Sequence, residues 1–236
     1  MNKNTVLRAT ILMGVAVLLI LSAGCTTGAD DGEVDVTSDE SYNTISVGEI
    51  AESLKNNGQI TAGLDLDSTT FYTDSVYYYG MTNIDGPNGT NIFGDSPEQN
   101  PAFISAVNNE FVGYYMPKNA AIDVVQMHQN RDDTVIFITK KRSSPDERIS
   151  DYISVIFGID SPIVIFTNGT SKTPSINEEN VSVYYGDSDG DITDSLAADH
   201  TCTPYRFMRN KMTLQYNDLN YSLGQYGESV IEDSDY

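Results

Sequence analysis

Short apolar runs separated by turn-forming residues are the feature of this sequence that most constrains its fold. From residue 111 onward, such runs occupy 111–116, 122–128, 134–140, 153–157, 163–167, 180–185 and 205–216. β-branched and aromatic residues are frequent in these runs, and runs of this length and composition are typical of β-strands. Strands that recur every ten or so residues predict a mainly β fold, an antiparallel β-sandwich or a similar arrangement.

A few segments carry helix signals instead. The capping-box pattern Ser-x-x-Glu occurs at 46–49, ahead of a helix that Gly58 can close, and again at 144–147. Asn100 with Pro101 predicts a short helix through residue 109, because proline suits the first helical position. Residues 69–81 are predicted as one or two further strands. We therefore expect a β-sandwich-like domain with one to three short helices, and an α+β arrangement stays open.

The N-terminus has the three zones of an export signal. A positive start is followed by Ala9–Leu21, a run without a charged residue, and by the small residues 22–24 before Cys25. A retained transmembrane helix is the alternative, but it needs about 20 apolar residues and this run is shorter unless 22–25 are included. We predict a signal peptide over 1–24 that is cleaved before Cys25.

The segment Leu21–Cys25 resembles the lipobox of prokaryotic lipoproteins, of an archaeal type. This resemblance implies that Cys25 is lipidated and holds the mature chain on the outer face of the cell membrane. An ordinary signal peptidase that cuts at the same bond is the alternative. Residues 25–45 are polar and acidic and are expected to form a flexible linker. A single extracytoplasmic domain over 46–226 and an acidic tail over 227–236 complete the predicted organisation.

The net charge of −21 limits the partners of the chain. Removal of the signal takes away Lys3 and Arg8 and makes the mature chain more acidic still. Nucleic acid is excluded as a partner, because phosphate contacts require lysine or arginine. Binding to an anionic membrane surface through a polybasic patch is excluded for the same reason. The expected partners are the membrane, through the anchor at Cys25, and a surface protein or a glycan.

Four alternating carboxylates form the clearest chemical signal in the body of the chain. Asp187, Asp189, Asp191 and Asp194 surround Gly190, and the stretch resembles the calcium loops of EF-hand and dockerin proteins. That resemblance implies calcium as the cofactor and these four residues as its ligands. The glycine precedes the third acidic residue and no glutamate stands at the twelfth position. A looser calcium loop and an acidic turn between strands therefore both stay open, and no other cofactor is expected.

The two histidines do not assemble a catalytic constellation. His128 lies in a predicted strand, where a hydrogen-bonded surface or core role is expected. Asp199, His200 and Cys202 could share a metal, but zinc requires more ligands and no Cys-x-x-Cys motif supplies them. Ordinary packing with Cys202 buried is the favoured interpretation. We assign no catalytic residue and predict that the protein is more a binding module than an enzyme.

Four Asn-x-Ser/Thr triplets are candidate glycosylation sites, headed by Asn88, Asn168, Asn180 and Asn220. Their number is about what the composition gives by chance. Asn88 and Asn168 stand in Asn-Gly turns, which favours exposure.

Two segments resemble the globular β domains of archaeal archaellins and pilins, namely Leu64–Phe71 and Asn180–Ser188. The resemblance implies a structural component of a surface layer or filament. Our first hypothesis is a membrane-anchored surface lipoprotein that acts as a binding or interaction module for an unidentified ligand. The filament component is the second hypothesis, and an extracytoplasmic enzyme is the third.

Overall fold

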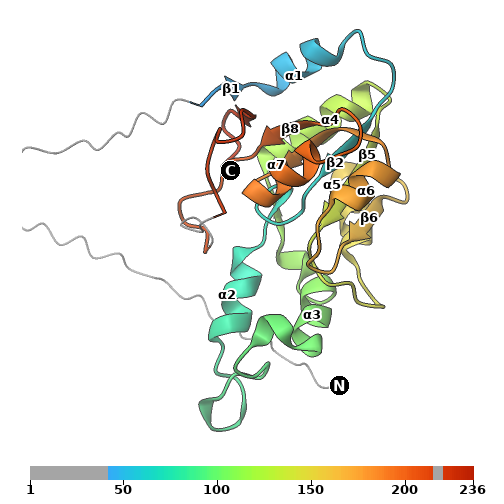
Figure 1. Ribbon diagram of the computed structural model, residues 1–236. Coiled ribbons are helices and arrows are strands. Elements are labelled where there is room, and N and C mark those ends of the chain that lie inside the picture. The colour runs from blue at the N-terminus through green and yellow to red at the C-terminus, as the bar shows by residue number, and fades with distance from the viewer. Residues whose placement is uncertain (1–41, 215–219) are drawn as a thin grey trace, which may run out of the picture. The chain divides into compact units, whose positions relative to one another are not determined.

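The computed structural model describes residues 42–214 and 220–236. Within these residues, the central element is a seven-stranded sheet in which every pairing is parallel (Figure 1). Its spatial order is β1-β9-β8-β7-β2-β5-β6. The strands are β1 (Thr44–Ile45), β2 (Thr61–Leu64), β5 (Thr134–Thr139), β6 (Ile163–Phe166), β7 (Val181–Gly186), β8 (Thr203–Arg206) and β9 (Ser229–Ile231). A separate antiparallel pair consists of β3 (Phe71–Tyr72) and β4 (Met116–Pro117).

Helices connect the strands, as parallel pairing requires. They are α1 (Val47–Leu54), α2 (Asp74–Thr82), α3 (Pro101–Asn108), α4 (Asn119–Asn130), α5 (Ile149–Phe157), α6 (Thr173–Glu178) and α7 (Asp189–Leu196). Single 3-10 turns occur at η1 (Pro87–Gly89), η2 (Pro97–Gln99) and η3 (Val112–Tyr114). The protein is thus an α/β protein, and the predicted antiparallel β-sandwich with one to three short helices is wrong.

Three of the predicted strands are helices. Residues 122–128 lie in α4, 153–157 lie in α5, and most of 69–81 lies in α2. In α5 the buried residues are Ile149, Ile153 and Phe157, a spacing of four that places them on one helix face. β-branched side chains favour strands only weakly, and burial of this face decides the structure.

Some of the other local predictions are wrong and some are confirmed. Residues 112–114 form η3, and only 205–206 of the described part of the run at 205–216 belong to β8. The capping box predicted at 144–147 is absent, because the N-cap of α5 is Arg148 without a side-chain cap. The Ser46–Glu49 capping box begins α1, and Pro101 occupies the first turn of α3. The runs at 134–140, 163–167 and 180–185 contain β5, β6 and β7.

The sheet separates two apolar clusters. Along β5, Val135 and Phe137 belong to the larger cluster, whereas Ile136 and Ile138 belong to the smaller one, because successive side chains of a strand point to opposite faces. From β2 the chain runs outward through β5 to β6 and then returns to the other side of β2 at β7. This reversal is a topological switch point, and ligands of open parallel sheets bind beside the carboxyl ends of the strands there.

An extension formed by α2, α3 and the turns between them projects from the sheet (Figure 1). Phe93 and Phe103 pack against each other in it, with ring centroids 5.0 Å apart. At the other end of the chain, the segment predicted as an acidic tail supplies β9, with Val230 and Ile231 buried. In the described residues, none of the helices has the length and apolar character needed to cross a membrane.

Candidate active site

Asp65 directly follows β2 at the switch point. Its N–H donates to the carbonyl oxygen of Tyr185 (2.9 Å), which extends the pairing of β2 with β7 by one residue. The residue is 7% exposed, and its carboxylate forms an ion pair with Lys172. A rigid strand end therefore fixes this carboxylate at the edge of the sheet.

Asp67 lies on the same loop and is more accessible. Its carboxylate accepts from Thr73 Oγ1 (2.6 Å) and pairs with Lys141 Nζ (2.8 Å). The loop turns at Ser68, which adopts a left-handed φ of 58° and donates its N–H to the Phe71 carbonyl. The Asp67 side chain is 26% exposed, compared with 10% for that of Asp65. The loop thus presents one buried and one accessible carboxylate.

The chain supplies two more carboxylates immediately after β7. Asp187 follows Gly186, and Asp191 lies in the first turn of α7. The Ser188 hydroxyl and the Asp191 carboxylate form a capping box at the start of this helix. A Cβ on Gly186 would lie 2.2 Å from Asp191 Cβ, so only glycine permits this close approach. Thr69 Oγ1 donates to Asp187 (3.1 Å) and ties the two loops together.

Besides Lys141, which pairs with Asp67, two cations lie among these carboxylates. Lys172, which is 1% exposed, immediately precedes α6, and its Nζ lies 2.7 Å from Asp191. Arg209 Nε lies 2.5 Å from Asp187. Although burial opposes the charge on Lys172, the neighbouring carboxylates outweigh it and raise its pKa well above the usual value. The ammonium is therefore charged in the folded protein.

Asp65, Asp187 and Asp191 form a buried triad whose ligand oxygens lie within 4.8 Å of one another. Burial raises the pKa of Asp65 well above its usual value, against the opposing effect of Lys172. For Asp191 the effect of burial is outweighed by Lys172 and the pKa falls. Like charges this close cannot all ionise without more positive charge. An all-oxygen donor set with excess negative charge suits a hard divalent cation, so this triad can bind a metal ion.

The triad opens into a cavity of about 380 Å³ at the carboxyl edge of the sheet. Although the chain is strongly acidic, the cavity wall carries cations. They are Lys140, Lys172 and Arg209. A polar cavity that combines carboxylates with fixed cations can bind an anionic substrate and activate it.

The structure separates the four predicted calcium ligands. Asp187 and Asp191 belong to the triad. Asp189 instead pairs with Arg206 at 2.8 Å, and Asp194 accepts from the backbone N–H that precedes α6. The acidic stretch is therefore the beginning of a helix, and calcium at these four positions stays a prediction.

The other residues considered in the sequence lie outside this cavity. His200 Nε2 is 2.8 Å from the Val181 carbonyl oxygen. Cys202 is buried, which raises its pKa to about 12. His128 is hydrogen-bonded to Asp133 (2.8 Å), but it lies in a helix rather than in a strand.

The candidate glycosylation sites are spread over the surface and the cavity walls. Asn88 and Asn180 occupy left-handed turns, Asn168 accepts from the N–H of Ser143 (2.9 Å), and Asn220 lines the cavity. Modification of all four stays a prediction. Cys25 lies outside the described residues.

Sequence reasoning missed the central residues of the site, which are Asp65, Asp67 and Lys172. The segment Leu64–Phe71 was singled out only for its resemblance to filament proteins. A usable signal was present, since both this segment and Val181–Asp191 place acidic residues directly after a buried strand. Lys172 gave no such signal, because it lies 107 residues from Asp65 in the sequence.

A parallel α/β sheet with a buried, metal-competent carboxylate triad and a lysine at its carboxyl edge is an arrangement that can serve an enzyme acting on an anionic substrate. Class B acid phosphatase from Marinomonas sp. (strain MWYL1) is 33% identical over 197 residues, which cover 81% of this chain and 79% of the relative. Class B acid phosphatase from Proteus mirabilis (strain HI4320) is 32% identical over 204 residues, with 81% and 80% covered. The chain belongs to the class B acid phosphatase family.

This membership corrects the functional hypotheses. The prediction of a binding module rather than an enzyme is wrong, and so are the archaellin, pilin and archaeal resemblances, because these relatives are bacterial phosphatases. The third hypothesis, an enzyme, agrees with membership of a phosphatase family. No family model matches the chain. Among solved structures, a hydrolase from Pseudomonas syringae aligns with a TM-score of 0.45 and 11% identity, covering 75% of this chain and 94% of that one.

Proposed function

We propose that the protein is a magnesium-assisted phosphatase that hydrolyses phosphomonoesters with Asp65 as the nucleophile. The observation that carries this proposal is the position of the Asp65 carboxylate, which meets Lys172, Asp187 and Asp191 at the edge of an open cavity. Membership of an acid phosphatase family supports the substrate class.

Asp65 is better placed than Asp67 to attack phosphorus. It belongs to the triad, and backbone pairing to β7 fixes it. Carboxylates act as nucleophiles in phosphoryl transfer through an aspartyl phosphate. Lys172 and Arg209 offer positive charge to the phosphoryl oxygens, which stabilises the negative charge of the transition state.

Asp67 is placed to move protons. In the first step the Asp65 oxygen bonds to phosphorus, the bond to the leaving oxygen breaks, and Asp67 gives its proton to that oxygen. In the second step Asp67 takes a proton from water, and the water oxygen attacks phosphorus. Inorganic phosphate leaves and the Asp65 carboxylate is restored. The greater exposure of Asp67 suits contact with both the alcohol and the water.

Asp65, Asp187 and Asp191 would hold the magnesium ion. When bound, the ion supplies positive charge that offsets repulsion within the triad and between the triad and the phosphate. Mg²⁺ binds a few carboxylates together with phosphate oxygens, which matches this donor set.

The location of the enzyme also belongs to the proposal. Cleavage before Cys25, and lipidation there, would place the phosphatase on the outer face of the membrane. Phosphate esters outside the cell would then be its substrates, in place of a surface protein or glycan partner.

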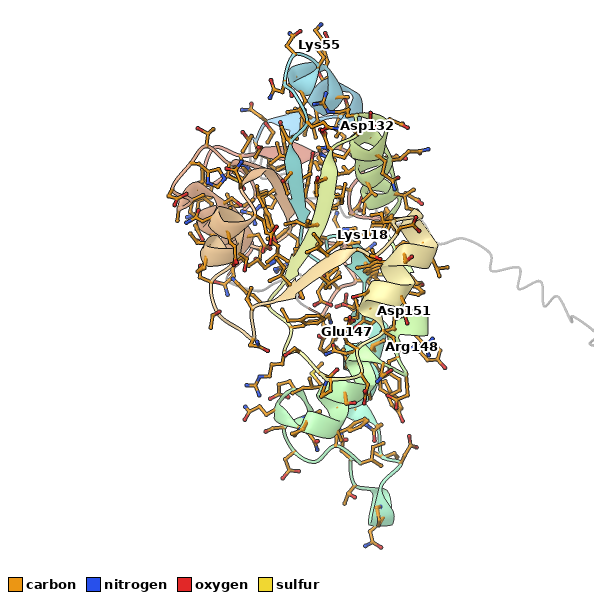
Figure 2. All side chains as sticks on the ribbon, turned by 90° about the vertical axis from the view of Figure 1, so that its right-hand side faces the viewer. Lys55, Lys118, Asp132, Glu147, Arg148 and Asp151 are labelled. Carbon is orange, nitrogen blue, oxygen red and sulfur yellow. The ribbon has the colours of Figure 1, made fainter. Side chains whose placement is uncertain are left out.

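Hydrolysis of 4-nitrophenyl phosphate with Mg²⁺ tests the nucleophile. Asp65→Asn should lower kcat by at least about 10³-fold, because the covalent step is lost. Asp67→Asn should lower it by about 10² to 10⁴-fold through loss of proton transfer. Asp151→Asn is the matched control, since this side chain is 78% exposed on α5 (Figure 2) and should leave kcat unchanged. Activity of Asp65→Asn near that of the control would overturn the proposal.

Thermal unfolding tests the metal. Mg²⁺ should raise the midpoint, because a ligand of the folded state stabilises it by about 2.7 kcal/mol at 100 times its Kd. Asp187→Asn should remove most of this shift by removing a triad oxygen. An equal shift in this variant and in Asp151→Asn would show that the ion binds elsewhere. If Ca²⁺ raises the midpoint and Mg²⁺ does not, the result would favour calcium as the ion bound at the triad.

A further inference from the structure

A second cavity of about 390 Å³ adjoins the catalytic one, and Lys140 lines both. Tyr77 lies on its wall and accepts a hydrogen bond from Lys141 Nζ (2.7 Å), and the same Nζ pairs with Asp67. The cavity therefore begins beside the residue to which we assign protonation of the leaving oxygen. A group that departs from the phosphate at Asp65 has room here.

The inner wall of this cavity is apolar. Phe103 and Val107 are buried there, and Phe103 meets Tyr77 edge to face at a centroid distance of 6.0 Å. Aromatic and aliphatic walls of this kind bind a flat apolar portion of a ligand.

The outer wall of this cavity differs from the inner wall because it carries charged side chains. Lys140, Lys141 and Arg142 follow β5 as three consecutive cations. Lys141 pairs with Asp67 and Lys140 with Asp194. Across residues 42–214 and 220–236, no carboxylate lies within ion-pair distance of the Arg142 guanidinium. Glu98 also lines the cavity, so the wall offers one uncommitted cation together with one anion.

The backbone of this basic turn is fixed by two asparagines. Asn108 Nδ2 donates to the carbonyl oxygen of Arg142 (2.8 Å). Asn168 Oδ1 accepts from the N–H of Ser143 (2.9 Å), and the backbone N–H of Asn168 donates to the Lys141 carbonyl oxygen. A guanidinium on a fixed backbone loses less entropy on binding an anion.

We propose that this enzyme prefers phosphomonoesters whose leaving group carries a second anionic group, bound by Arg142. The inference rests on the proposed function and adds the substrate class. The aromatic wall takes the body of the leaving group, and Arg142 binds its anion through charge-assisted hydrogen bonds. In a chain of net charge −21, a local cation at this wall offsets the general repulsion of a polyanionic substrate.

The test compares two substrates that differ in one charge, 4-carboxyphenyl phosphate and its neutral amide, 4-carbamoylphenyl phosphate, together with their 3-substituted isomers. The measured quantity is the ratio of kcat/KM for acid over amide. The wild-type ratio should exceed one for at least one isomer pair. Arg142→Ala should lower this ratio about tenfold and leave kcat/KM for the amide within about twofold.

Two further variants sharpen the result. Glu98→Gln should raise the ratio, because it removes a negative charge from the cavity wall and with it the repulsion of the anionic substrate. Arg148→Ala removes an exposed cation at the start of α5 (Figure 2) and should leave the ratio unchanged. The ratio should also fall with added salt, since the interaction is exposed.

An unchanged ratio in Arg142→Ala, or an equal loss for acid and amide, would overturn the inference. Such an outcome would leave the proposed function standing as long as hydrolysis of both substrates still required Asp65. Hydrolysis that survives Asp65→Asn would instead refute the proposed function.

Discussion

Two buried polar networks lie on opposite faces of β7, and they differ in charge balance. Tyr184 donates to the Ile138 carbonyl (3.0 Å) and accepts from Lys172 (2.9 Å), on the side that leads to Asp65 and Asp191. Tyr185, the next residue, belongs to the other apolar cluster, and its hydroxyl lies 2.8 Å from His128 Nε2. The strand thus supports two networks with successive side chains.

In the second network, around Tyr185, the polar groups pair with one another. His128 Nδ1 lies 2.8 Å from Asp133, and Arg131 Nε lies 2.8 Å from the same carboxylate. The other Asp133 oxygen accepts from the Ile60 N–H (3.1 Å). One carboxylate therefore meets one permanent cation. The Tyr184 network places two carboxylates on a single lysine, and this excess of negative charge distinguishes a site for a ligand cation from a structural network.

Removal of Lys172 should give the largest effect. Lys172→Met leaves Asp65 and Asp191 buried without their cation, which should lower the free energy of unfolding by about 3–5 kcal/mol. It should also lower kcat by about 10² to 10³-fold. The loss of stability should be greater at high pH and relieved as pH falls, because protonation removes the carboxylate charges. Chemical denaturation across pH measures this.

Lys55→Met is the control for that experiment. Lys55 is exposed and pairs with its neighbour Glu52 (Figure 2), so its removal should change stability little. Equal stability of the Lys172 and Lys55 variants would contradict the picture of an unbalanced network.

The two tyrosines provide an intermediate test. Tyr184→Phe and Tyr185→Phe each remove one buried hydroxyl from adjacent residues and should each cost about 1–3 kcal/mol in unfolding free energy. Tyr184→Phe should in addition lower kcat/KM about tenfold, because Lys172 loses a hydrogen-bond partner beside the nucleophile. Tyr185→Phe should leave kcat/KM within about twofold. Indistinguishable kinetics would show that both networks are structural.

The smallest effect concerns pH and the balanced network. Burial lowers the pKa of His128 below its usual value, although Asp133 opposes this. As pH falls through about 6.5, the unfolded chain takes up a proton that the folded protein does not, so stability decreases with decreasing pH in that window. His128→Gln should flatten the slope by up to about 1.4 kcal/mol per pH unit. Denaturant midpoints from pH 5 to 7 measure it, and an unchanged slope would assign the dependence to other groups.

Local signals in the sequence predicted several elements correctly. The Ser46–Glu49 capping box begins a helix because its partners are three residues apart. Residues 134–140, 163–167 and 180–185 contain strands because the runs are short and apolar. The strand predictions for residues 122–128 and 153–157 were wrong. They gave more weight to β-branched content than to the helical spacing of the residues that the fold buries.

Only part of the candidate site could be predicted from the sequence. Asp187 and Asp191 stood out because they are close along the chain, although the ligand set drawn around them included Asp189, which pairs with Arg206. Asp65 lies more than a hundred residues away, and no local pattern connects the two segments.

The sequence by itself determined the starts of two helices, several strands, the acidic charge and the prediction of export, because each depends on neighbours along the chain or on composition. Only the tertiary structure decided that the strands pair in parallel, and this pairing places the carboxyl ends of β2 and β7 side by side. Asp65, Asp187 and Asp191 thereby share one space with Lys172. Electrostatic coupling depends on distance in space, and the fold alone sets that distance.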